Sequence, residues 1–329
     1  MSTPAVSVLM PAFNTERFIG ASIRSVLAQD FDDFELLIVD DGSTDGTAEL
    51  VEDFHDNRIR LLRNETNSGL VETLNKGLRE ARGTWVARQD ADDLSRSDRL
   101  GRQLAYFRDN PDDVVVVSEA RLIDERDRGC GLLRLPRTRD QLRWDLCFRN
   151  PVPHSSVMMH REKILDAFGG YPDFVASEDY ALWSRVAATN CFGLIKRALV
   201  DYRIHSSSVM MSSGKGAADI AQIRRKNMEE TLEGIATPDQ IGLLADSWER
   251  PAGLSWEDYV PAFEPAAESF ARRHSKLGSV PGIEYQTLIA SGAPSASELL
   301  SALARHAPSR IPSVPWHRIA ISGLMRKMS

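Results

Sequence analysis

A run of acidic residues follows a strand-like stretch in the first third of the chain. Residues 84–89 have the character of a buried strand, and Asp90, Asp92 and Asp93 come directly after them. Carboxylates this close repel one another, and a hard divalent cation with a phosphate opposite usually offsets that repulsion. Ligands of open α/β sheets bind beyond the carboxyl ends of the strands. The position therefore favours chemistry on a diphosphate over the alternative, a solvated acidic turn that caps a helix starting near Ser97.

A second pair of carboxylates ends another strand-like stretch. Asp40 and Asp41 precede Gly42 and Ser43, directly after residues 34–39. Such a sequence alone is ordinary turn chemistry, but a carboxylate here could also accept the imide N–H of a uracil or thymine base. The common phosphate loops are absent, because the turn after the first strand lacks glycines and no Gly-Lys-Ser/Thr pattern occurs. Carboxylates at two strand ends are more than turns alone predict.

The segments that position these residues alternate between strand and helix. Apolar runs at 6–10, 34–39, 59–62 and 84–89 predict strands, and the segments between them have apolar residues at helical spacing. Helical connections of this length join parallel strands. The sequence therefore predicts an α/β fold with a mainly parallel sheet covered by helices on both faces.

The pattern changes after the acidic cluster. Helices are predicted at 97–110, 138–148 and 177–189, strands at 114–117, 154–159 and 199–204, and a polar turn at 124–131. We place the end of this domain near residue 211. Beyond it, helices are predicted at 216–236, 255–275 and 295–306.

The composition is that of a folded globular protein. Its 329 residues suggest two domains, and 42% apolar with 26% charged residues is an ordinary balance. The net charge of -7 argues against a nucleic-acid partner. Cys130, Cys147 and Cys191 lack metal-type spacing and are expected to be buried thiols in a reducing cytosol. Without a spanning apolar run or signal-peptide features, we expect the protein on the cytoplasmic side.

Four short motifs occur in a specific order. They are Val-Ser-Val-Leu-Met-Pro-Ala-Phe-Asn at 6–14, Val-Asp-Asp-Gly-Ser-Thr-Asp-Gly-Thr at 39–47, Asn-Ser-Gly at 67–69 and Asp-Ala-Asp-Asp at 90–93. With these motifs, and with the segments 177–185 and 202–205, the chain resembles family 2 glycosyltransferases. The resemblance covers residues 5–211. It implies an inverting enzyme of the GT-A fold, with a C-terminal helical extension outside the family pattern.

The resemblance assigns the nucleotide-binding residues. It implies that Pro11, Phe13 and Asp41 line the nucleoside pocket, with Asp41 reading the base. Asp40, by contrast, is expected to support the turn.

The resemblance also identifies the acidic cluster as the DXD motif of the family. Asp90 and Asp92 would be its two acidic positions, one near the ribose and one on a Mn²⁺ or Mg²⁺ that bridges the donor diphosphate. Asp93 would lie close to the metal or the donor sugar, and either Asp92 or Asp93 is the direct ligand. His205 matches a position that often completes the metal site, although a polar residue that ends a strand is the alternative.

The catalytic base is assigned in the same way. Asp179 matches the general base of the family, which must take the proton of the acceptor hydroxyl. Glu178 is the near alternative, and both charges also suit a helix N-terminus. His154 is expected near the acceptor entrance or as a hydrogen-bonded structural histidine. Arg88 either contacts phosphate or pairs with the acidic cluster.

The C-terminal tail is basic in an otherwise acidic protein. From Leu299 onward there is no acidic residue, whereas five are basic: Arg305, Arg310, Arg318, Arg326 and Lys327. Apolar residues from Trp316 to Leu324 have helical spacing. This pattern predicts either an interfacial helix in peripheral contact with a membrane or a helix that docks on the protein's own core.

These observations together predict a metal-dependent inverting glycosyltransferase. It would move a sugar from a UDP- or dTDP-type nucleoside diphosphate sugar to a hydroxyl of a cell-surface glycan or a lipid-linked acceptor. The catalytic domain would span residues 1–211, followed by a mostly helical region at 212–329. The alternatives are a sugar-phosphate nucleotidyltransferase, which would need a Gly-rich loop with Arg or Lys after the first strand, and a non-catalytic sugar-nucleotide-binding subunit of a glycan assembly complex.

Overall fold

The chain forms two compact units. The first contains residues 1–139 and 151–217, and the second contains residues 140–150 and 218–329. A computed structural model describes residues 3–174, 176–205, 216–249 and 251–274, with 299, 302, 303, 305 and 307. The predicted boundary at residue 211, most of the predicted helix at 295–306 and the tail at 312–329 lie outside the described residues.

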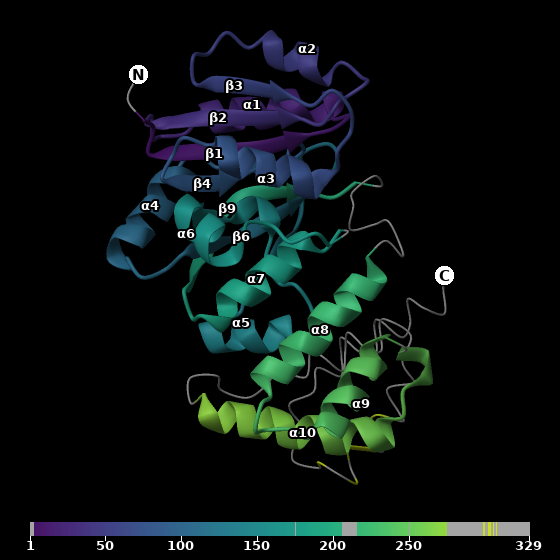
Figure 1. Ribbon diagram of the computed structural model, residues 1–329. Coiled ribbons are helices and arrows are strands. Elements are labelled where there is room, and N and C mark those ends of the chain that lie inside the picture. Colours follow the sequence, from purple (N-terminus) through teal and green to yellow (C-terminus); the bar gives the residue numbers. More distant parts are fainter. Residues whose placement is uncertain are drawn as a thin grey trace. The chain divides into compact units, whose positions relative to one another are not determined.

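The first unit is built around one sheet (Figure 1). Among the described residues its strands follow the order β3-β2-β1-β4-β8-β6-β9-β5, with β7 paired to β6. They are β1 (Val6–Ala12), β2 (Phe34–Asp40), β3 (Ile59–Arg63), β4 (Trp85–Arg88), β5 (Leu94–Ser95), β6 (Val115–Ile123), β7 (Gly129–Leu133), β8 (Met158–His160) and β9 (Phe192–Arg203). Strands β1 to β4 pair in parallel, as predicted, whereas β8 lies antiparallel between β4 and β6.

Helices cover both faces of this sheet. They are α1 (Glu16–Leu27), α2 (Thr47–Glu52), α3 (Leu70–Glu80), α4 (Arg99–Asp109), α6 (Arg161–Phe168) and α7 (Glu178–Ala188). Val8 of β1 shares a buried cluster with Ile19 and Ile23 of α1. Leu9 points to the opposite face, where its side chain would lie 2.2 Å from a Cβ added at Gly77 of α3. Alternation along the strand thus buries β1 on both sides.

Two local expectations need correction. The strand predicted at 154–159 begins only at Met158, because residues 154–156 form a 3₁₀ turn, η1 (His154–Ser156). The turn is closed by a hydrogen bond from the Ser156 N–H to the carbonyl of Pro153, at 3.0 Å. The expectation of buried thiols holds for Cys147 but is wrong for Cys130, which is exposed on β7, and Cys191 is only partly buried.

The second unit is helical. It contains α5 (Arg139–Leu146) and α8 (Ala217–Thr231), each apart from its first residue, together with α9 (Pro238–Glu249), the 3₁₀ turn η3 (Pro251–Gly253) and α10 (Trp256–Arg273). In the sequence, α5 falls between strands β7 and β8 of the sheet, yet its residues pack with the C-terminal helices. Within the described part of the chain, no helix has the length and apolar character needed to cross a bilayer.

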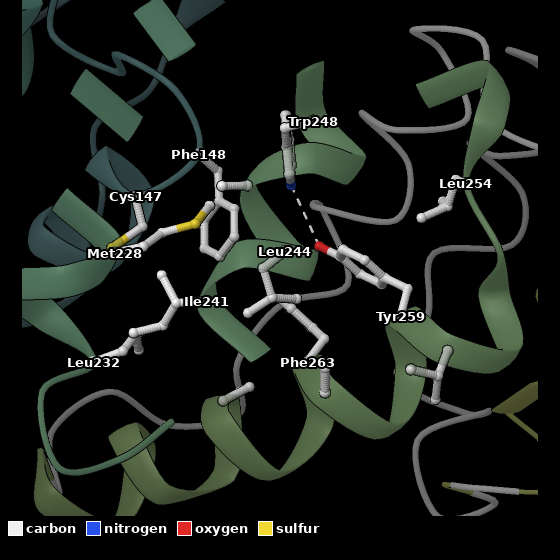
Figure 2. Packing of buried hydrophobic residues seen from close by; sticks show 14 of the residues in the cluster. Cys147, Phe148, Met228, Leu232, Ile241, Leu244, Trp248, Leu254, Tyr259 and Phe263 are labelled. Carbon is white, nitrogen blue, oxygen red and sulfur yellow. Dashed lines mark hydrogen bonds between the residues drawn. The ribbon is translucent and has the colours of Figure 1, made fainter. Parts of the chain in front are cut away.

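Aromatic side chains fill the core of the helical unit (Figure 2). Phe148, Phe263 and Tyr259 lie in this cluster, and the indole N–H of Trp248 donates a hydrogen bond to the Tyr259 hydroxyl at 3.3 Å. Trp144 of α5 is fully buried, with its ring centroid 5.2 Å from that of Phe148. Large buried rings dominate the energetics of such a core. Residues 140–150 are therefore part of this core rather than a surface loop.

Replacing Trp144 tests this assignment. Trp144→Ala should lower the free energy of unfolding by about 3–5 kcal/mol, because it removes a fully buried ring and leaves a cavity. Urea denaturation followed by circular dichroism measures the change. As a control, Leu132→Ala removes a side chain that is 41% exposed and should cost less than about 0.5 kcal/mol. A Trp144→Ala loss below about 1 kcal/mol would contradict the assignment.

Candidate active site

The predicted acidic residues meet at the carboxyl end of β4. Carboxylate oxygens of Asp90, Asp92 and Asp93 lie within 4.8 Å of one another. The Asp90 and Asp92 side chains are 30% and 26% exposed, whereas Asp93 is buried. The turn therefore presents two carboxylates towards solvent and keeps a third beneath them.

A buried arginine fixes the backbone of this turn. The Arg99 guanidinium donates hydrogen bonds to Gln89 Oε1 at 2.9 Å and to the Arg88 carbonyl at 2.7 Å. Gln89 in turn donates to the Asp93 carbonyl at 2.9 Å. Burial and the nearby charge of Arg88 lower the pKa of Arg99 to about 9, so it remains a cation at neutral pH. The turn is thus supported from α4, which the motif alone did not indicate.

Arg203, at the end of β9, fixes the other side of the cluster. Its backbone N–H donates to Asp93 Oδ1 at 2.7 Å, and its Nε donates to the Asp92 carbonyl at 2.7 Å. Asp93 Oδ2 has no hydrogen-bond partner among the described residues. Burial and the negative charges of Asp90 and Asp92 raise the pKa of Asp93 well above its usual range. Burial and the charge of Asp90 also raise the pKa of Asp92.

These groups suit a divalent cation. His205 lies next to the cluster, with its Nε2 2.7 Å from Asp92 Oδ2. Its ring is held 5.2 Å from the ring of Phe18. A cation would compensate the unpartnered oxygen of Asp93 and the repulsion that raises both pKa values. Carboxylate oxygens are the ligands that Mn²⁺ and Mg²⁺ prefer, so Asp92 and Asp93 could hold either ion, with His205 as a nitrogen ligand beside them.

Asp41 directly follows β2, and both of its carboxylate oxygens accept hydrogen bonds. Oδ1 accepts hydrogen bonds from Asn64 Nδ2 at 2.7 Å and from the Ser68 N–H at 2.8 Å. Oδ2 accepts from the Gly69 N–H at 2.9 Å. A carboxylate has about four acceptor sites, so one remains for a further donor. The Asn-Ser-Gly motif is therefore fastened to Asp41, and base recognition by Asp41 stays a prediction.

The neighbouring strand end carries the other predicted nucleoside-pocket residues. Pro11 is buried in β1, and Phe13, just after the strand, is 44% exposed. The Asn14 N–H donates to Ser43 Oγ at 3.0 Å, which joins this loop to the one after β2. The turn after β2 is also braced by Asp40, whose Oδ1 accepts from the Ser43 N–H at 3.2 Å. Phe13 and Asp41 thus lie on two loops that are tied together.

Glu178 and Asp179 open helix α7. Glu178 is buried, whereas Asp179 is partly exposed and accepts a hydrogen bond from the Tyr180 N–H at 2.5 Å. Burial and the charge of Asp179 raise the pKa of Glu178 to about 8, and the positive charge of Arg88 acts against this rise. Glu178 is therefore mostly protonated at neutral pH. A protonated carboxyl cannot accept a proton, so Glu178 is poorly suited to act as the base.

His154 takes part in a hydrogen-bonded aromatic cluster. Its Nε2 lies 2.9 Å from the Tyr171 hydroxyl, and its ring centroid is 5.8 Å from that of Trp183. Asn75 holds the Tyr171 backbone by two hydrogen bonds of 2.8 Å. Burial and the charge of Arg88 lower the pKa of His154 well below its usual range. His154 is thus a neutral, hydrogen-bonded histidine, as one of the two alternatives predicted.

Three supporting residues were not assigned from the sequence. Arg88 pairs with the acidic cluster through Asp90, which was one of its two predicted roles. Ser155, Arg99 and Arg203 had no predicted role. Ser155 donates a hydrogen bond to Asp90 although 65 positions separate them. Only Arg203 had a usable signal, because it stands inside the segment that contains His205.

Comparisons with known proteins find glycosyltransferases along much of the chain. The family described as Glycosyl transferase family 2 matches residues 7–166. An uncharacterized glycosyltransferase of Haemophilus influenzae is 31% identical over 249 residues, or 70% of this chain and 76% of that protein. The UDP-Glc:alpha-D-GlcNAc-diphosphoundecaprenol beta-1,3-glucosyltransferase WfgD of Escherichia coli is 30% identical over 212 residues, or 64% of this chain and 81% of that protein.

A solved structure extends the likeness to the architecture. The crystal structure of S. aureus TarS 1-349 in complex with UDP-GlcNAc matches with a TM-score of 0.58 and 19% identity. The match covers 94% of this chain and 92% of that chain. At this level of identity the likeness concerns the fold.

The raised pKa of Glu178 leads to a pH-dependent stability. The folded-state pKa of about 8 exceeds the ordinary value of 4.5. The stability that the protonated carboxyl allows is therefore fully present below pH 4.5. It is lost as the pH rises through 8, because the unfolded chain ionises Glu178 more readily than the folded protein does. Glu178→Gln should therefore gain melting temperature relative to wild type between pH 5 and pH 8, as thermal denaturation would show. Glu162→Gln, at a side chain that is 69% exposed, is the control and should show no such trend. If the difference in melting temperature between Glu178→Gln and wild type did not change with pH, the raised pKa of Glu178 would be refuted.

Proposed function

Because this chain belongs to glycosyl transferase family 2, we propose that it transfers a sugar with inversion from a nucleoside diphosphate sugar to an acceptor hydroxyl. The predicted family and the predicted GT-A fold are both confirmed. The observation that carries the proposal is the acidic cluster after β4, with His205 Nε2 2.7 Å from Asp92. Such a cluster usually binds a divalent cation that also contacts a diphosphate.

The strand order supports a binding path for the donor. Strands β2 and β4 lie on either side of β1 and run parallel to it, so their carboxyl ends open on the same edge of the sheet. A nucleoside could contact Phe13 and Asp41 after β1 and β2, while its diphosphate reaches Asp92 after β4. Ligands of open α/β sheets bind at this edge.

The chemistry assigned to the protein is proton removal and leaving-group stabilisation. Asp179 takes the proton of the acceptor hydroxyl, whose oxygen forms a bond to the anomeric carbon. The bond from that carbon to the diphosphate oxygen breaks, and the diphosphate leaves with the electron pair. A Mn²⁺ or Mg²⁺ held by Asp92, Asp93 and His205 would supply positive charge to the departing diphosphate. Attack opposite the leaving group inverts the anomeric configuration.

The substrate class is proposed from the relatives. TarS binds UDP-GlcNAc, and WfgD is described as using UDP-Glc with a diphosphoundecaprenol acceptor. WbnJ of Escherichia coli, 30% identical, is described as an O-antigen biosynthesis glycosyltransferase. A UDP- or dTDP-type donor and a cell-surface glycan or lipid-linked acceptor are therefore proposed here. Peripheral membrane contact through the tail at 312–329 would suit an acceptor of this kind.

The metal assignment is tested by nucleotide binding. UDP or dTDP should bind far more tightly with Mn²⁺ or Mg²⁺ than with a chelator, and Asp92→Ala should remove this difference because one carboxylate ligand is lost. Isothermal titration calorimetry measures both. Asp112→Ala removes an exposed carboxylate before β6 and should bind like wild type. Equal affinity of the wild-type protein in metal and in chelator would sink the metal assignment.

The base assignment is tested by turnover. Asp179→Asn should lower kcat by about 10²–10⁴-fold while metal-dependent UDP binding stays nearly unchanged, because a general base acts on the chemical step. Glu178→Gln should cost much less. The released product should have the anomeric configuration opposite to that of the donor, as NMR would show. Near-normal turnover of Asp179→Asn, or a retained configuration, would overturn the mechanism, and binding without any donor turnover would favour a non-catalytic subunit.

A further inference from the structure

Asp90 is held from two sides by residues that the motif does not contain. Arg88 Nη2 donates to Asp90 Oδ1 at 2.6 Å. Ser155 Oγ donates to Asp90 Oδ2, and the Asp90 N–H donates back to Ser155 Oγ at 3.1 Å. Both carboxylate oxygens and the backbone of Asp90 are therefore fixed, one side from β4 and the other from the turn η1.

Arg88 differs from the other buried arginine beside it. Arg99 is fully buried and uses its guanidinium in five hydrogen bonds, to Gln103, Gln89, Ser95 and the carbonyls of Arg88 and Val157. Arg88 is 1% exposed, yet among the described residues its guanidinium donates only to Asp90, and its Nε and Nη1 have no partner there. Arg99 therefore acts as a structural crosslink. Arg88 does not.

This arrangement is costly for stability. A buried donor without an acceptor loses its hydration and gains nothing in return. A buried charge with a single partner also loses more hydration energy than one ion pair usually returns, so it adds little to the stability of the fold. Such local costs are expected at functional sites, where a residue is kept for what it does to a neighbour. The neighbour here is the Asp90 carboxylate.

We propose that Arg88 and Ser155 form a clamp that fixes the Asp90 carboxylate in the orientation needed to bind the nucleotide of the donor. The inference rests on the proposed function. Both are positioning residues, because each acts through Asp90. We name them the Asp90 clamp.

The clamp also connects two parts of the site. Ser155 follows His154, whose Nε2 lies 2.9 Å from the Tyr171 hydroxyl. Asn75 of α3 holds the Tyr171 backbone at 2.8 Å. Asp90 is therefore oriented by a turn that is itself anchored to α3. Displacement of that turn would move the donor-side carboxylate.

Two adjacent serines give a matched test. Ser155 and Ser156 are both fully buried in η1, but Ser156 Oγ donates to the Pro153 carbonyl at 2.7 Å instead of Asp90. Ser155→Ala should weaken UDP binding in the presence of Mn²⁺ by about tenfold, the size expected for a hydrogen bond to a charged group. Ser156→Ala should change it less than about twofold. Calorimetry measures the affinities, and thermal melting reports the stability of each variant.

The charge of Arg88 is tested separately. Arg88→Met should weaken UDP binding by about 100-fold, and Arg88→Lys, which keeps the charge, should recover part of the loss. In turnover assays the clamp variants should raise KM for the donor more than they lower kcat, since Asp90 is oriented for binding. A merely structural role would lower the melting temperature without moving donor KM. If Arg88→Met does not fold, the comparison of Ser155→Ala with Ser156→Ala still tests the clamp.

The outcomes separate the clamp from the proposed function. Unchanged UDP affinity in Ser155→Ala, or an equal loss in Ser156→Ala, would overturn the clamp and leave the proposed function standing. A wild-type protein that binds none of UDP, dTDP and GDP with Mn²⁺ would overturn the proposed function and the clamp together. Selective loss in Ser155→Ala with partial recovery in Arg88→Lys supports the clamp.

Discussion

Mutual repulsion among three carboxylates is the constraint on which the site depends. Asp90, Asp92 and Asp93 are held within 4.8 Å, so the surrounding fold must supply both compensating charge and a rigid backbone. Arg88 provides charge to Asp90, and Arg203 provides two hydrogen bonds from the end of β9. The compensation is incomplete, because the pKa values of Asp92 and Asp93 stay raised. That deficit is the physical reason a divalent cation suits the cluster.

The sequence predicted what is encoded locally. Strands β1, β2 and β4 have apolar runs that end at turn residues, and the acidic cluster is contiguous in the chain, so both could be read without knowing the fold. Non-local contacts could not. The antiparallel position of β8, the packing of α5 with α8–α10 and the contact of Ser155 with Asp90 depend on segments far apart in the sequence. Helix α9, which lies between two predicted helices, was not predicted.

One buried cation affects both sides of the site. The charge of Arg88 pairs with Asp90, acts against the raised pKa of Glu178 and helps to lower the pKa of His154. The protonation of the residues at the start of α7 and in η1 is therefore linked to the same guanidinium. At low effective dielectric such coupling persists over several ångströms. The donor-side carboxylates and the residues predicted to face the acceptor are thus not electrostatically independent.

The placement of residues 140–150 makes the two units inseparable by a single cut. The chain passes from one unit to the other after residues 139, 150 and 217, so the helical unit is not a module appended to the end of a finished domain. A recombinant that exchanged only the chain after residue 217 would keep Trp144 and Phe148 but give them foreign helices to pack against. Chimeras within the family would need to exchange the 140–150 segment together with α8–α10. The turn η1, which follows this segment in the sequence, would then lie between two stretches of chain of different origin.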